Sequence, residues 1–133
     1  MSKVTTFLMF DGKAEEAMNF YVSLFEGSSV VSVERYGPEG PGAEGSVRFA
    51  VFRLNGQNYM CIDSPAKPDF TFTPAISLYV TCKTEEEIYR LFKQLRQGGR
   101  VLMEMAPLPP HSKKFAWVTD RFGVSWQLSQ PQK

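Results

Sequence analysis

The same amphipathic helix pattern occurs twice in this chain, 71 residues apart. Apolar residues recur at intervals of three and four, so they share one face of each helix and predict that this face is buried. The first stripe consists of Ala17, Phe20, Tyr21 and Leu24, and the second of Ile88, Leu91, Phe92 and Leu95. Gly27 follows the first pattern and Gly98 the second, where helices commonly end in a left-handed residue. The chain therefore contains an internal repeat.

Strand signals surround both helix patterns in the same order. Apolar runs at 7–9 and 78–80 precede the helices, and further runs follow them. Asn55-Gly56 lies between two of these runs and is a strong hairpin signal. The turn at 120–123 occupies the corresponding place in the second half. Each half thus predicts strand, helix, strand, strand, strand. We expect one α+β domain made of a first module at 3–64, a linker at 65–73 and a second module at 74–129.

Local signals differ in strength between the two halves. Thr84, with Glu87 three residues on, predicts a capping box at the start of the second helix. Residues 11–13, before the first helix, give a weaker start signal. The segment 37–45 contains four Gly and two Pro and predicts a mobile loop. The segment 106–111 is stiffer, because each proline fixes φ.

Composition limits the classes of partner. The 15 basic and 14 acidic residues give a net charge of +1, without the basic surplus typical of nucleic-acid binders. The N-terminus shows no signal-peptide pattern, and no segment approaches the roughly 20 apolar residues of a membrane span. Cys61 and Cys82 form no CxxC pair and are expected to be reduced, buried and structural. We expect a cytoplasmic protein with no nucleic-acid or membrane partner.

The predicted modules also suggest where a ligand binds. A four-stranded sheet with a helix on one face leaves its other face partly apolar. Two such sheets, set edge to edge and curved, would form one mixed sheet that encloses a cleft lined by alternate side chains. Clefts of this kind are the default location of small-molecule sites.

The sequence resembles the vicinal-oxygen-chelate superfamily, which includes glyoxalase I, extradiol dioxygenases and bleomycin-resistance proteins, and within it the PhnB-like branch. The matching stretches are Thr6–Asp11, Ala14–Ala17 with Phe20-Tyr21, Leu54–Gln57, Ile76–Val80, Phe115–Val118 and Asp120–Gln127. The resemblance implies the glyoxalase/bleomycin-resistance fold and a homodimer. That branch often carries the label 3-demethylubiquinone-9 3-methyltransferase, but the chain lacks the Gly-rich turn after a parallel strand that a typical methyltransferase uses.

Catalytic members of the superfamily bind a divalent metal through four inward side chains. The resemblance carries those positions onto Thr5, Met60, Ile76 and Gln127, and only Gln127 offers an ordinary oxygen ligand. A hydroxyl, a thioether, an aliphatic group and an amide replace the hydration shell of a divalent ion poorly. We therefore expect no metal and no other cofactor.

The same positions and strand alternation predict the lining of the cleft. The expected lining residues are Thr5, Phe7, Met9, Met60, Ile62, Ile76, Leu78, Ser125 and Gln127. His111, the only histidine, is the candidate general acid or base, with Asp63 or Glu104 as a possible acidic partner. An apolar lining with a few amides and hydroxyls suits an aromatic or otherwise hydrophobic molecule.

These observations favour a metal-independent protein that binds a small apolar or aromatic molecule and acts as a homodimer. Sequestration of a toxic compound, as in bleomycin resistance, is one version of that function. The alternative is an enzyme, a lyase, isomerase or transferase, that acts through His111 and a nearby acid. A third interpretation is a regulatory or scaffolding dimer whose cleft is vestigial.

Overall fold

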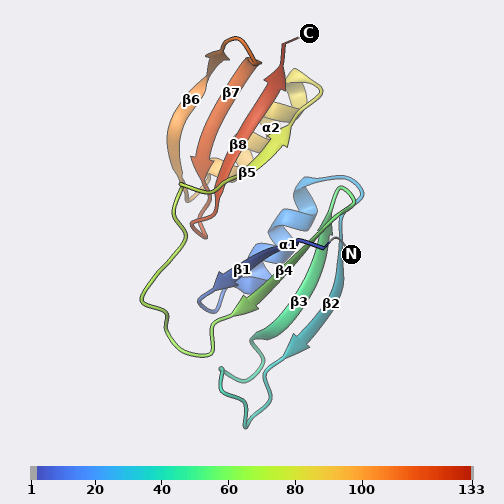
Figure 1. Ribbon diagram of the computed structural model, residues 1–133, viewed down its shortest axis with the longest axis vertical. Coiled ribbons are helices and arrows are strands. Elements are labelled where there is room, and N and C mark those ends of the chain that lie inside the picture. The colour runs from blue at the N-terminus through green and yellow to red at the C-terminus, as the bar shows by residue number, and fades with distance from the viewer. Residues whose placement is uncertain (1–2, 133) are drawn as a thin grey trace. The chain divides into compact units, whose positions relative to one another are not determined.

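The computed structural model describes residues 3–132. The chain divides between Phe70 and Thr71 into two compact units, and this boundary lies within the predicted linker at 65–73. Each unit contains one helix and four strands in the order strand, helix, strand, strand, strand (Figure 1). The structure thus confirms the α+β class and the element order predicted from the repeat.

The two units have matching sets of elements. The first unit contains β1 (Thr6–Phe10), α1 (Ala14–Leu24), β2 (Ser29–Arg35), β3 (Val47–Leu54) and β4 (Gln57–Asp63). The second contains β5 (Leu78–Thr81), α2 (Glu85–Arg96), β6 (Arg100–Leu108), β7 (Ser112–Thr119) and β8 (Ser125–Pro131).

Each unit forms its own four-stranded mixed sheet. The strand order is β1-β4-β3-β2 in the first unit and β5-β8-β7-β6 in the second. The first and last strands of each unit pair in parallel, and the other pairs are antiparallel. The two halves therefore share one topology. A single curved sheet that encloses a cleft stays a prediction.

In the first unit, α1 covers one face of the sheet. Tyr21 of α1 is fully buried, and its ring centroid lies 6.4 Å from that of Phe52 on β3. Of the predicted stripe, Phe20 is only half-buried, and Met18 is buried instead. The sheet presents Leu8, Phe10, Ala50, Phe52 and Cys61 as its buried apolar residues on this side. These residues form the core of the first unit.

In the second unit, α2 buries the predicted stripe of Ile88, Leu91, Phe92 and Leu95. Thr84 Oγ1 accepts a hydrogen bond from the backbone N–H of Glu87 at 3.1 Å, which confirms the N-cap. The Glu87 carboxylate accepts a hydrogen bond from the backbone N–H of Lys83. In a standard capping box it would accept from the backbone N–H of the N-cap residue, Thr84.

The start of α1 depends on a distant carboxylate instead of a local cap. Asp63, at the end of β4, is 3% exposed. One carboxylate oxygen accepts from the backbone N–H of Ala14 at 2.9 Å, and the other accepts from that of Val47 at 2.9 Å. A negative charge at a helix N-terminus also interacts favourably with the helix dipole. Asp63 therefore joins the start of α1 to the start of β3.

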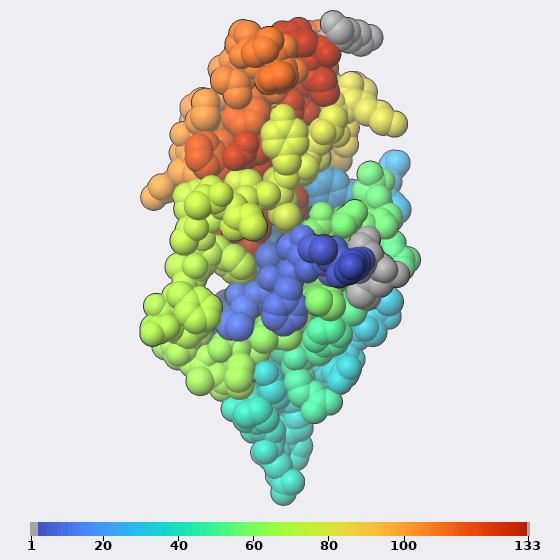
Figure 2. Space-filling model, in the orientation of Figure 1, coloured from blue at the N-terminus to red at the C-terminus, as the bar shows by residue number. Residues whose placement is uncertain are grey.

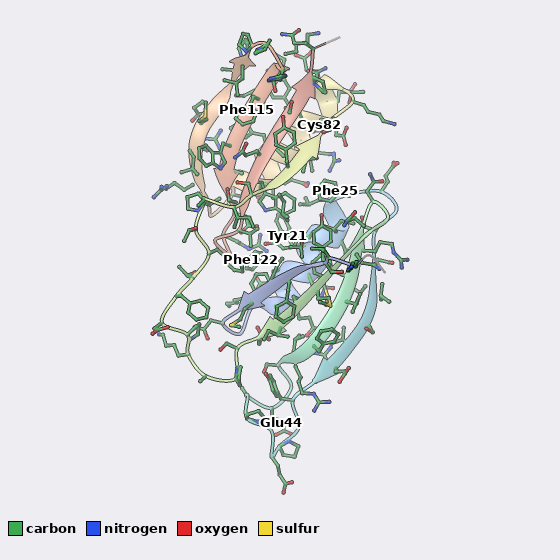
Figure 3. The ribbon with its side chains drawn as sticks, in the orientation of Figure 1. Tyr21, Phe25, Glu44, Cys82, Phe115 and Phe122 are labelled. Carbon is green, nitrogen blue, oxygen red and sulfur yellow. The ribbon has the colours of Figure 1, made fainter. Side chains whose placement is uncertain are left out.

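The loop at 37–45 packs over a buried tyrosine, and its mobility stays a prediction. Tyr36 is buried beneath it, and a side chain at Gly42 would lie 2.5 Å from the Tyr36 ring. The Gly45 N–H donates to the Tyr36 carbonyl at 2.9 Å, and the Ser46 N–H donates to the Ala43 carbonyl at 3.0 Å. Figure 2 shows the loop as a narrow projection from the first unit, and Figure 3 labels Glu44 within it.

The turn signals of the sequence are confirmed. Asn55 and Gly56 have φ values of 48° and 86° and join β3 to β4 as a two-residue hairpin loop. Gly27 and Gly98, after the two helices, have φ values of 68° and 73°. Neither helix within residues 3–132 has the length and apolar character needed to span a bilayer.

Candidate functional site

The sheet face opposite α2 carries a row of large side chains across four strands. Tyr79 on β5 pairs with Gln127 on β8, which pairs with Trp117 on β7, which pairs with Met103 on β6. Paired residues on adjacent strands point to the same side of a sheet. Tyr79 is 56% exposed and Met103 40%, whereas Gln127 and Trp117 are half-buried. We call these four residues the open-face row.

A cluster of uncharged hydrogen-bonding groups adjoins the open-face row. The Oγ atoms of Ser77 and Ser125 lie 2.7 Å apart. Trp117 Nε1 donates to Ser125 Oγ at 2.8 Å, and Gln127 Nε2 donates to Ser77 Oγ at 3.3 Å. Ser77, Trp117, Ser125 and Gln127 form what we call the serine cluster. The cluster fixes the orientation of two members of the open-face row.

The pairing register corrects the face expected for one predicted lining residue, Leu78. Leu78 pairs with Trp126, which is 1% exposed on the side that α2 covers. Ile76 is 77% exposed and precedes β5. The residue that contacts Gln127 from this segment is Ser77. Which residue of this segment matches the position implied by the resemblance stays a prediction, because sequence matching does not fix the register of a parallel strand pair.

On the same sheet face, the residues in the first half of β7 and their partners on β8 are buried. Phe115, labelled in Figure 3, pairs with Ser129 and is 5% exposed. Ser129 Oγ lies 2.6 Å from Ser112 Oγ, and both serines are buried. The accessible part of this face is therefore the part around Tyr79, Gln127 and Met103.

In the first unit, four of the predicted lining residues share the face opposite α1. Phe7 pairs with Met60, and Met9 pairs with Ile62. Phe7 is 47% exposed, and the other three are half-buried. Thr5 is half-buried and precedes β1. This face is apolar, and its role as one wall of a cleft stays a prediction.

The residues at the positions implied for metal ligands do not fit a divalent ion. The implied positions hold Thr5, Met60, Ile76 and Gln127, none of which carries a charge, and Ser77 in place of Ile76 would add none. Ser77 accepts a hydrogen bond from the Gln127 amide. No group of three or more His, Cys, Asp or Glu side chains with a metal-binding arrangement occurs within residues 3–132. A divalent ion needs charged or imidazole ligands, which this donor set lacks.

The three residues proposed for proton transfer are not brought together within either unit. His111 is exposed in the turn between β6 and β7 of the second unit. Glu104 lies on β6, has a side chain that is 70% exposed, and is 3.8 Å from Arg96. Asp63 belongs to the first unit, and both of its carboxylate oxygens accept backbone hydrogen bonds. Its environment is that of a structural residue.

Both cysteines are free thiols with no solvent exposure. Burial raises the pKa of Cys61 to about 12, and the negative charge of Asp63 adds to this shift. Burial likewise raises the pKa of Cys82 to about 12. Cys82, labelled in Figure 3, follows β5. A thiol that stays protonated near neutral pH is a poor nucleophile.

Comparisons with known proteins agree with this architecture. The family model described as 3-demethylubiquinone-9 3-methyltransferase matches residues 2–129. A putative 3-demethylubiquinone-9 3-methyltransferase, the PhnB protein from Bacillus cereus, is 60% identical, with a TM-score of 0.94 over 97% of this chain and 99% of that chain. Protein PA1353 from Pseudomonas aeruginosa is 26% identical, with a TM-score of 0.86 over the whole of both chains.

A more distant structure shares the fold alone. The glyoxylase/bleomycin resistance protein/dioxygenase domain from Frankia is 12% identical, with a TM-score of 0.68 over 99% of each chain. No curated protein matches the chain. Together with the paired units and their common topology, these matches show that the chain belongs to the PhnB-like 3-demethylubiquinone-9 3-methyltransferase family and has the glyoxalase/bleomycin-resistance fold.

Proposed function

We propose that the chain is a metal-independent binding protein for a small apolar or aromatic molecule, which lies against the open-face row of the second sheet. The observation that carries this proposal is the exposure of Tyr79 and Met103 on either side of Gln127 and Trp117. Large exposed apolar side chains that gather around a few fixed polar groups are typical of ligand sites.

The physical basis of binding is the removal of this apolar surface from water. Each square ångström of apolar surface that a ligand covers contributes roughly 25 cal/mol. Trp117 and Tyr79 also offer ring faces, and a ring-to-ring contact adds about 0.5–1.5 kcal/mol. Because Trp117 is held by its hydrogen bond to Ser125, its ring loses little further freedom when a ligand binds.

The test is a thermal-shift screen of the dialysed protein with uncharged aromatic compounds of one or two rings. A ligand that binds only the folded state stabilises it by mass action, by about 2.7 kcal/mol at a concentration of 100 times Kd. Elemental analysis of the same sample tests metal independence. One equivalent of tightly bound divalent metal per chain would contradict the proposal.

Two exposed tyrosines of the second unit provide a matched pair of variants. Tyr79, in the open-face row, is 56% exposed, and Tyr89, on α2, is 44% exposed. We expect Tyr79→Ala to weaken the binding of each compound that scores in the screen, and Tyr89→Ala to leave it unchanged. Equal effects of the two substitutions, or a screen without any thermal shift, would refute the proposed site.

Three further expectations from the sequence stay predictions. Pairing of two copies would satisfy the exposed edges of the sheets, among which β2 carries the exposed residues Val30 and Val31. The cytoplasmic location stays an expectation from the sequence. An enzyme that acts through His111 would require an acid other than Asp63, whose two oxygens hold the backbone.

A further inference from the structure

The serine cluster contains one more hydroxyl hydrogen than its internal hydrogen bonds use. Trp117 and Gln127 each direct an N–H donor at a serine oxygen. Ser77 and Ser125 bring two hydroxyl hydrogens, and the contact between their oxygens uses only one of them. With the Gln127 amide oriented so that Nε2 faces Ser77, the remaining hydrogen takes part in no hydrogen bond within the described part of the chain. The cluster as a whole is therefore a hydrogen-bond donor.

Burial decides which serine holds the remaining hydrogen. Ser125 is 1% exposed, and its Oγ contacts only Trp117 and Ser77 within the described part of the chain. A Ser125 hydrogen that did not point at Ser77 would be buried without an acceptor, which is costly. Ser125 therefore donates to Ser77, which also accepts from Gln127. The hydroxyl hydrogen of the partly exposed Ser77 is left to face outward.

We propose that Ser77 donates a hydrogen bond to an uncharged acceptor oxygen, such as a ketone carbonyl, on the aromatic ligand of the open face. This inference rests on the proposed function and adds the chemical class of the ligand. A carbonyl can lie at Ser77 while the rest of the molecule covers Tyr79, which is beside Gln127 in the sheet. The ligand is thus an aromatic molecule that carries an uncharged acceptor oxygen.

A neutral oxygen suits this site better than a carboxylate. None of the four residues of the serine cluster is charged, and an anion buried without a counter-charge loses much of its hydration energy. Arg100 pairs with Thr119, which pairs with Ser125, so the backbone of Arg100 is two strands away on the edge strand β6, and no hydrogen bond joins Arg100 to the cluster. The cluster supplies a dipolar donor instead of a cation.

The experiment compares 1-indanone with indane, which has the same rings without the carbonyl, by NMR titration of the full chain. The measured quantity is the ratio of Kd for indane to Kd for 1-indanone. We expect Ser77→Ala to lower this ratio about five- to tenfold, because the loss of one hydrogen bond weakens the binding of 1-indanone by about that factor. The same substitution should leave the Kd of indane unchanged. Ser77→Thr keeps the hydroxyl and should keep the ratio, and Ser23→Ala, on α1, is the control.

The outcomes separate this inference from the proposed function. If both compounds bind and Ser77→Ala leaves the ratio unchanged, the donor role of Ser77 is wrong and the proposed function stands. If neither compound binds, both are wrong. Tighter binding of indane-1-carboxylate than of 1-indanone would overturn the preference for a neutral oxygen. In the wild-type protein, the infrared carbonyl stretch of bound 1-indanone should lie below its frequency in hexane, and an unshifted band would also contradict the hydrogen bond.

Discussion

Replacement of Asp63 should destabilise the first unit strongly, although Asp63 does not belong to the proposed binding site on the second sheet. In Asp63→Ala, the N–H groups of Ala14 and Val47 lose the acceptors that lie 2.9 Å from each of them. A buried donor left without a partner costs about 1–3 kcal/mol, so the two together cost about 2–6 kcal/mol. The lost attraction between the carboxylate and the start of α1 adds up to about 1 kcal/mol.

Urea denaturation followed by far-UV circular dichroism measures this loss. With a slope of about 1–3 kcal/mol per molar urea, a loss of about 3 kcal/mol lowers the midpoint by about 1–3 M. Asp63→Asn keeps the volume of the side chain and one carbonyl oxygen, so one of the two N–H groups keeps its acceptor. The loss in this variant should be about half of that in Asp63→Ala.

Asp69→Ala is the matched control, because Asp69 is an exposed aspartate outside the helices and strands. Surface substitutions of this kind usually change stability by less than about 0.5 kcal/mol. Equal midpoints for Asp63→Ala and Asp69→Ala would refute the structural role of Asp63. Equal losses for the alanine and asparagine variants would show that the separate bonds to Ala14 and Val47 are not what stabilises this region.

Two further predictions concern packing and thiol reactivity. Gly42→Ala should destabilise the loop by about 1–3 kcal/mol, because the new methyl group would lie 2.5 Å from the Tyr36 ring. Gly37→Ala is the control, because a methyl group at position 37 would meet no atom within 4 Å. Equal melting temperatures of the two variants would contradict the packing of Gly42 against Tyr36. Burial raises the pKa of Cys61 and Cys82 to about 12, whereas an ordinary thiol has a pKa of about 8.5. Both thiols should therefore react with iodoacetamide at pH 8 about a thousandfold more slowly in the folded chain than in guanidinium. Fast alkylation of the folded chain would contradict their burial.

The sequence predicted those parts of the fold that depend on local signals. Asn55-Gly56 and Thr84 each act on neighbours within a few residues, and each was found in the predicted role. The cap on α1 could not be predicted in this way, because Asp63 lies 49 residues from Ala14 and only the pairing of β4 with β1 brings them together. The order of the elements depends only on which segments form helices and strands, so the repeated pattern was enough to predict it.

The candidate site was predicted less completely than the fold. Gln127 and Ser125 were correctly expected on one face, because strand alternation fixes them relative to the buried Trp126. The contact of Ser77 with Gln127 was not predicted, since β5 has only four residues and its apolar run alone does not set its register against β8. The hydrogen bond between Ser77 and Gln127 reveals the register, and only the folded structure contains it.

The two tryptophans of the chain lie on opposite faces of the second sheet, which has a spectroscopic consequence. Trp117 belongs to the open face and donates to Ser125, whereas Trp126 is 1% exposed and donates to Asp120. A molecule bound at the open face would alter the fluorescence of Trp117, while Trp126 would provide a constant internal reference. Since the first unit contains no tryptophan, emission excited at the red edge of the absorption band reports on the second unit alone.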